Sequence, residues 1–405
     1  MHDKRPALPY SPTMALPLPD LTLPLPDAAA SLRRVLAGVT RAHSDALRQA
    51  AVRHDRHLAH VLAVLESAGV LRPLLLRPNV SVLARVWLAV PDQRPLLRDR
   101  LIAALATEAA LLGRLPEPID VTPVAVGLPR LGWRIEPQDA TALRIAHDGL
   151  HFQTPAGPLT LPLDAPAPLD VPVRVWPAYV PFHPALPNAR LALADDNPLP
   201  IFYDHPKRRG NVVSLGDQPQ QAWLDQLAFA VDHIAAHLPA LLDEMRLLLG
   251  HVVPVGFLEE DHQSASYPHA LGTIYLTLHP RPMMMLEALI HEFQHNKLHA
   301  LMQLGPILVG DEDLRVASPV RPDPRPLRGV LLAVHAFLPV ADLYRRLAAA
   351  DDPLAREHWF AERYAAIRAT NRAAWLTVQK HANWSPLALG LAEELARLDR
   401  ALSEP

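Results

Sequence analysis

Residues 282–304, "PMMMLEALIHEFQHNKLHALMQL", constrain the fold of this chain more than any other stretch of its sequence. Pro282 suits the first turn of a helix, and the residues after it contain no helix breaker. The stretch therefore predicts a helix of about six turns with an apolar back face. Within this apolar run stand His291, Glu292, His295 and His299, and polar groups on such a helix need partners.

The spacing of His291 and His295 predicts a metal site on this helix. Four residues advance the chain by about 400°, so both imidazoles project from one face, about one turn apart. Two ring nitrogens so placed can converge on one ion at about 2.1 Å. With Glu292 between them, the residues form a complete HExxH pattern. The alternative is an ordinary helix whose two histidines are satisfied by the surrounding protein.

His299 continues the series at the next i+4 position. Its Cα lies about 12 Å along the helix axis from that of His291, so it does not readily share one ion with both other histidines. We expect His299 beside the site or on the surface rather than among the ligands.

Composition excludes several classes of function. The chain has 405 residues, a formal net charge of −3 and no cysteine, so disulfides and thiolate ligands are excluded. The near-neutral charge gives no support for nucleic-acid binding. Prolines interrupt the N-terminal residues throughout, unlike a signal peptide, and no run of eighteen apolar residues suggests a membrane span. We predict a cytoplasmic protein.

The order of sequence patterns predicts an α+β fold that is mainly helical. A Pro-rich extended N-terminus at residues 1–30 precedes a helical lobe at residues 31–116 and a β-rich section at residues 117–205. Residues 206–405 then form the HExxH metal-binding catalytic domain, with a short zincin-like sheet.

Individual elements follow from the same patterns. One long helix is expected from Gln220 to Gly250, and the histidines of the N-terminal lobe, at positions 43, 54, 57 and 60, are expected on a solvated face. Two short strands, "HVVPVGFLEE" and "GTIYLTLHP", are expected before the HExxH helix. Three helices are expected after it, at residues 327–349, 353–373 and 386–402.

One class of metal chemistry is excluded by the residues that follow the motif. The extended zinc-protease pattern HExxHxxGxxH fails, because leucine stands at positions 298 and 301. A zinc metallopeptidase of another kind would take a carboxylate from a later helix, and Glu357 and Glu362 are the candidates. Glu292 would then be the general base for a zinc-bound water.

A third ligand can also come from residues 318–344, "SPVRPDPRPLRGVLLAVHAFLPVADLY". A Pro-rich loop here carries Arg321 and Arg325, and an apolar helix with one histidine, His335, follows. The loop is long enough for this helix to lie beside the HExxH helix. His335 is therefore predicted as the third ligand, and the alternative is a satisfied core histidine.

"EALIHEFQHNKLHAL" and "RPDPRPLRGVLLAVHAF" together resemble the HEXXH-motif proteins found beside gene clusters for ribosomally synthesised peptides, described as α-ketoglutarate-dependent HExxH-type peptide β-hydroxylases. The resemblance covers residues 262–345, including "SASYPHALGTIYLTL". One departure is Val320, where family members commonly have tryptophan before the first loop arginine. The resemblance implies Fe(II) rather than zinc, α-ketoglutarate as co-substrate and a precursor peptide as substrate.

The residues are compatible with that chemistry. Three protein ligands leave three positions on Fe(II), of which α-ketoglutarate takes two and O₂ the third. Arg321 or Arg325 would bind the distal carboxylate of α-ketoglutarate, unless each only pairs with Asp323 or a helix end. Glu292 would orient ligands or water. The residues from Ser264 to Gly272 precede a strand that could serve as an edge for an extended peptide, or form an ordinary loop.

Three hypotheses thus remain from the sequence. The first is an Fe(II)/α-ketoglutarate oxygenase that hydroxylates a side-chain β-carbon in a precursor peptide. The second is a zinc metallopeptidase with Glu292 as general base. The third is a non-catalytic peptide-binding protein with a structural metal.

Overall fold

The computed structural model describes residues 28–163, 172–199, 212–310, 314–317, 319 and 323–403. The extended N-terminus predicted for residues 1–30 falls almost wholly outside these ranges, and so does Arg321.

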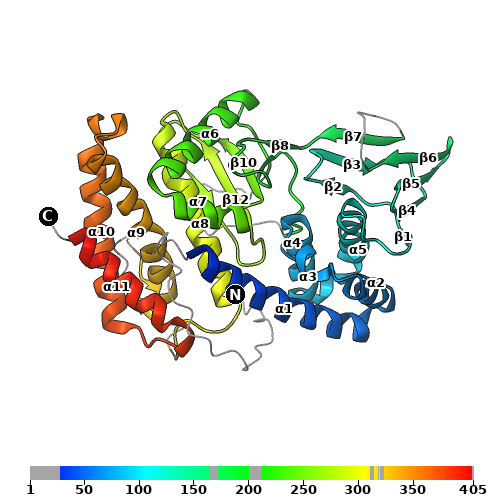
Figure 1. The fold of residues 1–405 in the computed structure, drawn as a ribbon, viewed down its shortest axis with the longest axis horizontal. Coiled ribbons are helices and arrows are strands. Elements are labelled where there is room, and N and C mark those ends of the chain that lie inside the picture. The colour runs from blue at the N-terminus through cyan, green and yellow to red at the C-terminus, as the bar shows by residue number, and fades with distance from the viewer. Residues whose placement is uncertain are drawn as a thin grey trace.

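The protein is mainly helical with several small sheets, so the predicted fold class is correct. Figure 1 shows an elongated molecule with the N-terminal helices and the β-rich section at one end, a mixed sheet in the middle and the C-terminal helices at the other end. Two hydrophobic cores lie along it, and the first helix contributes to both. The predicted domain boundaries stay a prediction.

The first core joins the N-terminal helices to two antiparallel sheets, in the orders β1-β4-β5-β6 and β2-β3-β7. Helix α1 ends where Asp55, as N-cap, accepts a hydrogen bond from the Leu58 amide and begins α2. The elements are α1 (Ala28–His54), α2 (Arg56–Ser67), α3 (Leu71–Leu74), α4 (Pro78–Ala89), α5 (Arg94–Leu111), β1 (Ile119–Val121), β2 (Val126–Leu128), β3 (Trp133–Pro137), β4 (Ala142–Ala146), β5 (Gly149–Thr154), β6 (Gly157–Pro162) and β7 (Val173–Pro177).

The second core surrounds a five-stranded sheet of order β11-β12-β10-β9-β8. Its three central strands are parallel, and both edge strands run antiparallel to their neighbours. The elements are β8 (Tyr179–Pro181), β9 (Arg190–Ala192), α6 (Gln220–His237), α7 (Pro239–Leu248), β10 (His251–Phe257), β11 (Ser264–Ala265), β12 (Thr273–Leu278), α8 (Pro282–Met302), β13 (Arg315–Val316), β14 (Arg325–Pro326), α9 (Leu327–Ala349), α10 (Phe360–His381) and α11 (Leu389–Ser403).

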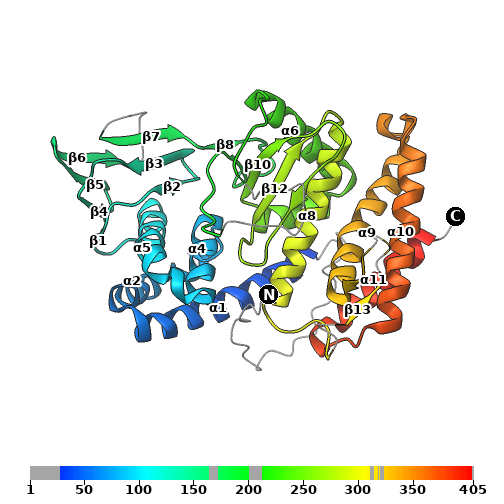
Figure 2. The ribbon, with the colours of Figure 1, turned by 180° about the vertical axis from the view of Figure 1, so that it is seen from behind.

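Helix α8 begins at Pro282, as predicted, and lies between strand β12 and helix α9 (Figure 1 and Figure 2). The predicted helix 327–349 matches α9 at both ends. The helix predicted at 353–373 instead begins at Phe360, because Pro353–Arg356 form a 3₁₀ turn capped by Asp352. Two further 3₁₀ turns, Pro91–Gln93 and Pro386–Ala388, precede α5 and α11.

Three sequence predictions were wrong. The long helix expected from Gln220 to Gly250 is two helices, because Pro239 has no N–H and disfavours a helical conformation at Leu238. His43 is buried rather than solvated, and its burial lowers its pKa well below the usual value. The strand at Thr273–Leu278 is not the edge of its sheet, since β11 covers it.

Helix α9 is long and apolar enough to cross a membrane by length and composition, although no such span was predicted. Within the protein, 72% of its most apolar window is buried against other elements. This burial is typical of a core helix, and α9 packs between α8 and α10.

Candidate metal centre

Helix α8 holds the motif because its apolar side is enclosed. Leu286, Leu289, Ile290 and Phe293 are completely buried in the second core and fix the rotation of the helix. The face that carries His291 and His295 is only partly covered. The sequence thus positions both imidazoles by burying the residues around them.

The two histidines form the geometry that one ion requires. The Nε2 atoms of His291 and His295 lie 2.9 Å apart, and their rings are nearly perpendicular at 83°. Two nitrogens at about 2.1 Å from one ion, at angles of about 90–110°, would be about 3.0–3.4 Å apart. The observed separation is close to this range, so the two rings fit a single metal ion.

Burial keeps both imidazoles in the form that binds metal. The pKa of His291 is well below its usual value because of burial, with smaller contributions from the charges of His295, His262, Arg363 and His335. The pKa of His295 is also lowered by burial, against the opposing charge of Glu292. Neutral imidazole is the ligand form.

Glu292 is the third member of the cluster. A ligand atom of Glu292 lies within 4.8 Å of those of His291 and His295. Its Oε1 accepts a 2.6 Å hydrogen bond from Ser264 Oγ, and its Oε2 is buried without a hydrogen-bond partner in the structure as described. Since Ser264 belongs to β11, this bond joins the edge strand to the metal-binding face.

Asn296 fixes α8 against the sheet at the level of the motif. Its Oδ1 accepts a 2.8 Å hydrogen bond from the Gly272 amide, and its Nδ2 donates to the Thr273 carbonyl. Gly272 has φ +81°, and a Cβ there would lie 2.5 Å from the Leu248 carbonyl oxygen. Only glycine combines a positive φ with the absence of a Cβ, so the turn before β12 requires glycine at this position.

His335 lies on α9, the helix packed beside α8, and is completely buried. Its charge contributes a little to the lowered pKa of His291. Among the described residues, the group of ligand atoms within 4.8 Å of one another contains His291, Glu292 and His295, and not His335. The third-ligand role of His335 therefore stays a prediction. Phe337, two residues on, packs its ring 4.3 Å from that of His291.

The alternative carboxylate ligands do not lie in the cluster. Glu357 and Glu362 are both exposed, and neither belongs to the group around His291. His299 is buried on the next turn, with its ring 6.3 Å from that of His295, which places it beside the ligands as expected. Burial, together with smaller contributions from nearby cations, lowers its pKa to about 3.

Of the two arginines predicted to bind the distal carboxylate of α-ketoglutarate, the structure describes one. Arg325 lies in β14, where its Nε is 3.1 Å from Asp323, and Arg321 is outside the described residues. The arginine whose charge acts on His291 is Arg363 of α10. Arg363 is held by Glu287, one turn before His291, through a 2.6 Å contact.

Arg363 and Ser264 are the residues that sequence reasoning did not assign. Tyr344 also donates a hydrogen bond to Glu287, so that three helices meet at this carboxylate. A charged residue at position 287, one turn before the first histidine in an apolar run, was the available signal, since a buried glutamate needs a partner.

Searches of protein-family models and of curated proteins each found no match to this chain.

Proposed function

We propose that this protein is an Fe(II)/α-ketoglutarate-dependent oxygenase that hydroxylates a side-chain β-carbon in a ribosomally synthesised precursor peptide. In this reaction a C–H bond, α-ketoglutarate and O₂ become a C–OH group, succinate and CO₂. The proposal extends the resemblance of residues 262–345, and it includes a cytoplasmic location.

The ligand set carries the proposal. His291 and His295 converge, His335 is buried on the neighbouring helix α9, and the carboxylates expected of a peptidase, Glu357 and Glu362, are exposed. Imidazole ligands with open positions suit Fe(II) as well as zinc, and the resemblance of residues 262–345 favours Fe(II). Fe(II) would be held by His291, His295 and His335, and when bound it would supply redox chemistry with O₂.

The remaining residues would position the reactants. Ser264 orients Glu292 by their hydrogen bond, and Glu292 in turn lies beside both imidazoles. Among the described residues, strand β11 pairs with β12 alone, so an extended peptide can add to its other edge by backbone hydrogen bonds. Arg321 or Arg325 is the predicted anchor for the distal carboxylate of α-ketoglutarate, and Arg363 joins them because its ion pair with Glu287 holds it one turn from His291.

The zinc metallopeptidase remains the second candidate, because Glu292 lies within the ligand cluster beside an antiparallel edge strand. Glu292 would then accept a proton from a metal-bound water.

Glu292→Gln separates the two candidates, because it keeps size but removes basicity. In the oxygenase it keeps appreciable succinate formation from α-ketoglutarate, whereas loss of a general base costs a peptidase about 10²–10⁴-fold. The measurement pairs a succinate assay with mass spectrometry of the peptide, which gains one oxygen atom and is not cleaved. Peptide cleavage without α-ketoglutarate, lost in Glu292→Gln, overturns the oxygenase and supports the peptidase.

Single alanine variants of Arg321, Arg325 and Arg363 identify the anchor. The one that binds α-ketoglutarate raises its KM strongly, because a charge-assisted bidentate contact is lost. Arg41→Ala, on the exposed side of α1, is the matched control. Unchanged KM in all three variants contradicts an arginine anchor at these positions.

A further inference from the structure

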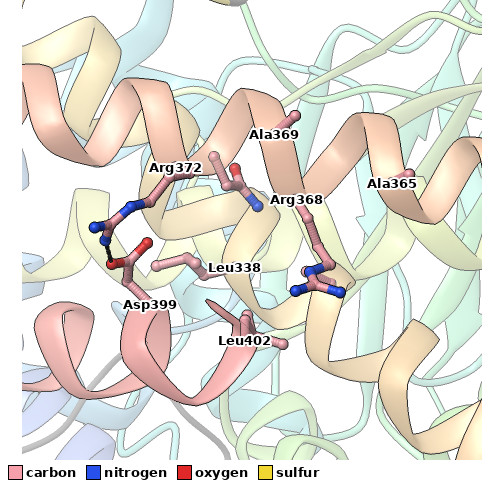
Figure 3. Close-up of a pocket in the computed structure, with 9 residues that line it drawn as sticks. Leu338, Ala365, Arg368, Ala369, Arg372, Asp399 and Leu402 are labelled. Atoms are coloured by element: carbon pink, nitrogen blue, oxygen red, sulfur yellow. Dashed lines mark hydrogen bonds and ion pairs between the residues drawn. The ribbon is translucent and has the colours of Figure 1, made fainter. Parts of the chain in front are cut away.

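A cavity of about 400 Å³ lies between α9, α10 and α11, and none of the HExxH residues lines it. Figure 3 shows α10 along one side, Leu338 of α9 behind and Leu402 of α11 opposite. Its volume falls within the range of small-molecule sites, about 300–1,000 Å³.

One face of α10 lines the cavity with two alanines and two arginines. Ala365 and Arg368 are three residues apart, as are Ala369 and Arg372, and the second pair follows the first by four residues, so all four share a single face of the helix. The two alanines are exposed at the rim and leave room that larger side chains would fill.

The two arginines of this face differ in their partners. Arg372 forms an ion pair with Asp399 of α11 at one end of the cavity (Figure 3). Arg368 lies at the other end, with its guanidinium 5.5 Å from the centre of the Tyr364 ring. Within the described part of the chain, Arg368 has no carboxylate within ion-pair distance, so the cavity carries one cation without an anionic partner.

Asn371 gives a second, independent indication of a ligand. It lines the cavity, is only 4% exposed, and its Nδ2 has no hydrogen-bond acceptor in the structure described. A buried donor without an acceptor is unfavourable, and a ligand or water can supply the missing group.

We propose that this cavity is a binding site for a small carboxylic acid with a short aliphatic body. Arg368 binds the carboxylate, Asn371 donates to an acceptor oxygen, and the aliphatic body packs on Leu338 and Leu402. The site is separate from the metal centre, and the proposal does not depend on the reaction catalysed there.

The test is isothermal titration calorimetry of the full chain with 4-methylpentanoate, and with the uncharged 4-methylpentanamide as matched probe. We expect saturable binding of the acid and at least about tenfold weaker binding of the amide, because a charge-assisted hydrogen bond is lost. Arg368→Gln weakens binding of the acid by a similar factor. Arg41→Gln, a substitution of an exposed arginine on α1, leaves it unchanged.

Ala369→Trp provides a second test that does not depend on removing the charge of Arg368. Ala369 is exposed on α10, so tryptophan there fills the cavity without entering the core, and we expect binding of the acid to be lost. The proposal is overturned if the wild type shows no saturable binding, if acid and amide bind equally, or if Arg368→Gln and Ala369→Trp both bind as the wild type does.

Discussion

Helix α8 carries polar side chains on two faces, and the two faces differ in how fully these groups are paired. On one, Lys297 is completely buried, with its Nζ 2.8 and 2.9 Å from the two oxygens of Glu244 on α7. On the other, His291 and His295 meet only through their Nε2 atoms, and their buried Nδ1 atoms have no hydrogen-bond partner among the residues described.

The fully paired groups fix the position of α8, and the incompletely paired groups are available to bind a metal ion. Lys297 lies about 200–240° around the axis from the two histidines, so it points away from the metal-binding face. A completed ion pair fixes one arrangement of α7 and α8. Incompletely paired imidazoles and Glu292 leave ligand atoms for a metal ion instead.

The largest effect expected is loss of metal. His291→Ala or His295→Ala abolishes tight metal binding, because the ion loses one of its few protein ligands and is left partly solvated. Metal content of anaerobically purified protein after chelator challenge measures this. His299→Ala, one turn along the same helix, is the control and keeps a full equivalent. A full equivalent in both ligand variants would show that this face of α8 does not bind the metal.

A substitution on the face that carries the Lys297–Glu244 ion pair should lower the stability of the fold and leave metal binding unchanged. Lys297→Met leaves Glu244 buried and unpaired, and burial already raises the pKa of that carboxyl. We expect the free energy of unfolding in urea to fall by about 3–5 kcal/mol. The double variant Lys297→Met/Glu244→Leu recovers most of this, since no buried charge remains. Metal bound per folded molecule stays constant, and a parallel loss of metal would erase the distinction between the two faces.

A buried histidine away from the metal gives a smaller, pH-dependent effect. Burial, partly opposed by Asp196 and assisted by Arg190, lowers the pKa of His251 to about 4; its ring also lies 5.4 Å from that of Tyr179. Between pH 6.5 and 4 the unfolded chain binds this proton and the folded chain does not, so stability falls as pH falls, by up to about 3 kcal/mol.

His251→Asn should therefore flatten the loss of stability between pH 6.5 and 4, as followed by urea unfolding at a series of pH values. His54→Asn, at an exposed position of α1, is the control and leaves the slope as it is in the parent protein. An unchanged slope in His251→Asn would show that this imidazole is protonated equally in both states.

The smallest effect is expected at the hydrogen bond between the edge strand and the motif. Ser264→Ala removes the donor to Glu292 Oε1 and leaves the carboxylate free to turn. Groups that orient the surroundings of a metal site typically contribute about 10–100-fold, and we expect the lower end, about tenfold in kcat/KM. Ser264→Thr keeps the hydroxyl and restores activity. Equal activity in the alanine and threonine variants would show that the bond does not serve the site.

Part of this site was predictable because it depends on local periodicity. The four-residue spacing of His291 and His295 puts both rings on one face of any α-helix, and Pro282 marks where that helix begins. The α+β class followed from the same short-range patterns. The break at Pro239 also has a local cause, but the apolar pattern continues on both sides of this proline and so predicts one helix.

The other features required the tertiary structure, because they join residues far apart in the chain. Ser264 reaches Glu292 only when β11 pairs with β12, and Arg363 reaches Glu287 only when α10 packs near α8. His43 is buried because other helices pack over it, and a short sequence pattern does not predict that packing. The sequence by itself determined the metal-binding face of one helix; packing decided which side chains surround that face, since burial and pairing are properties of the assembled core.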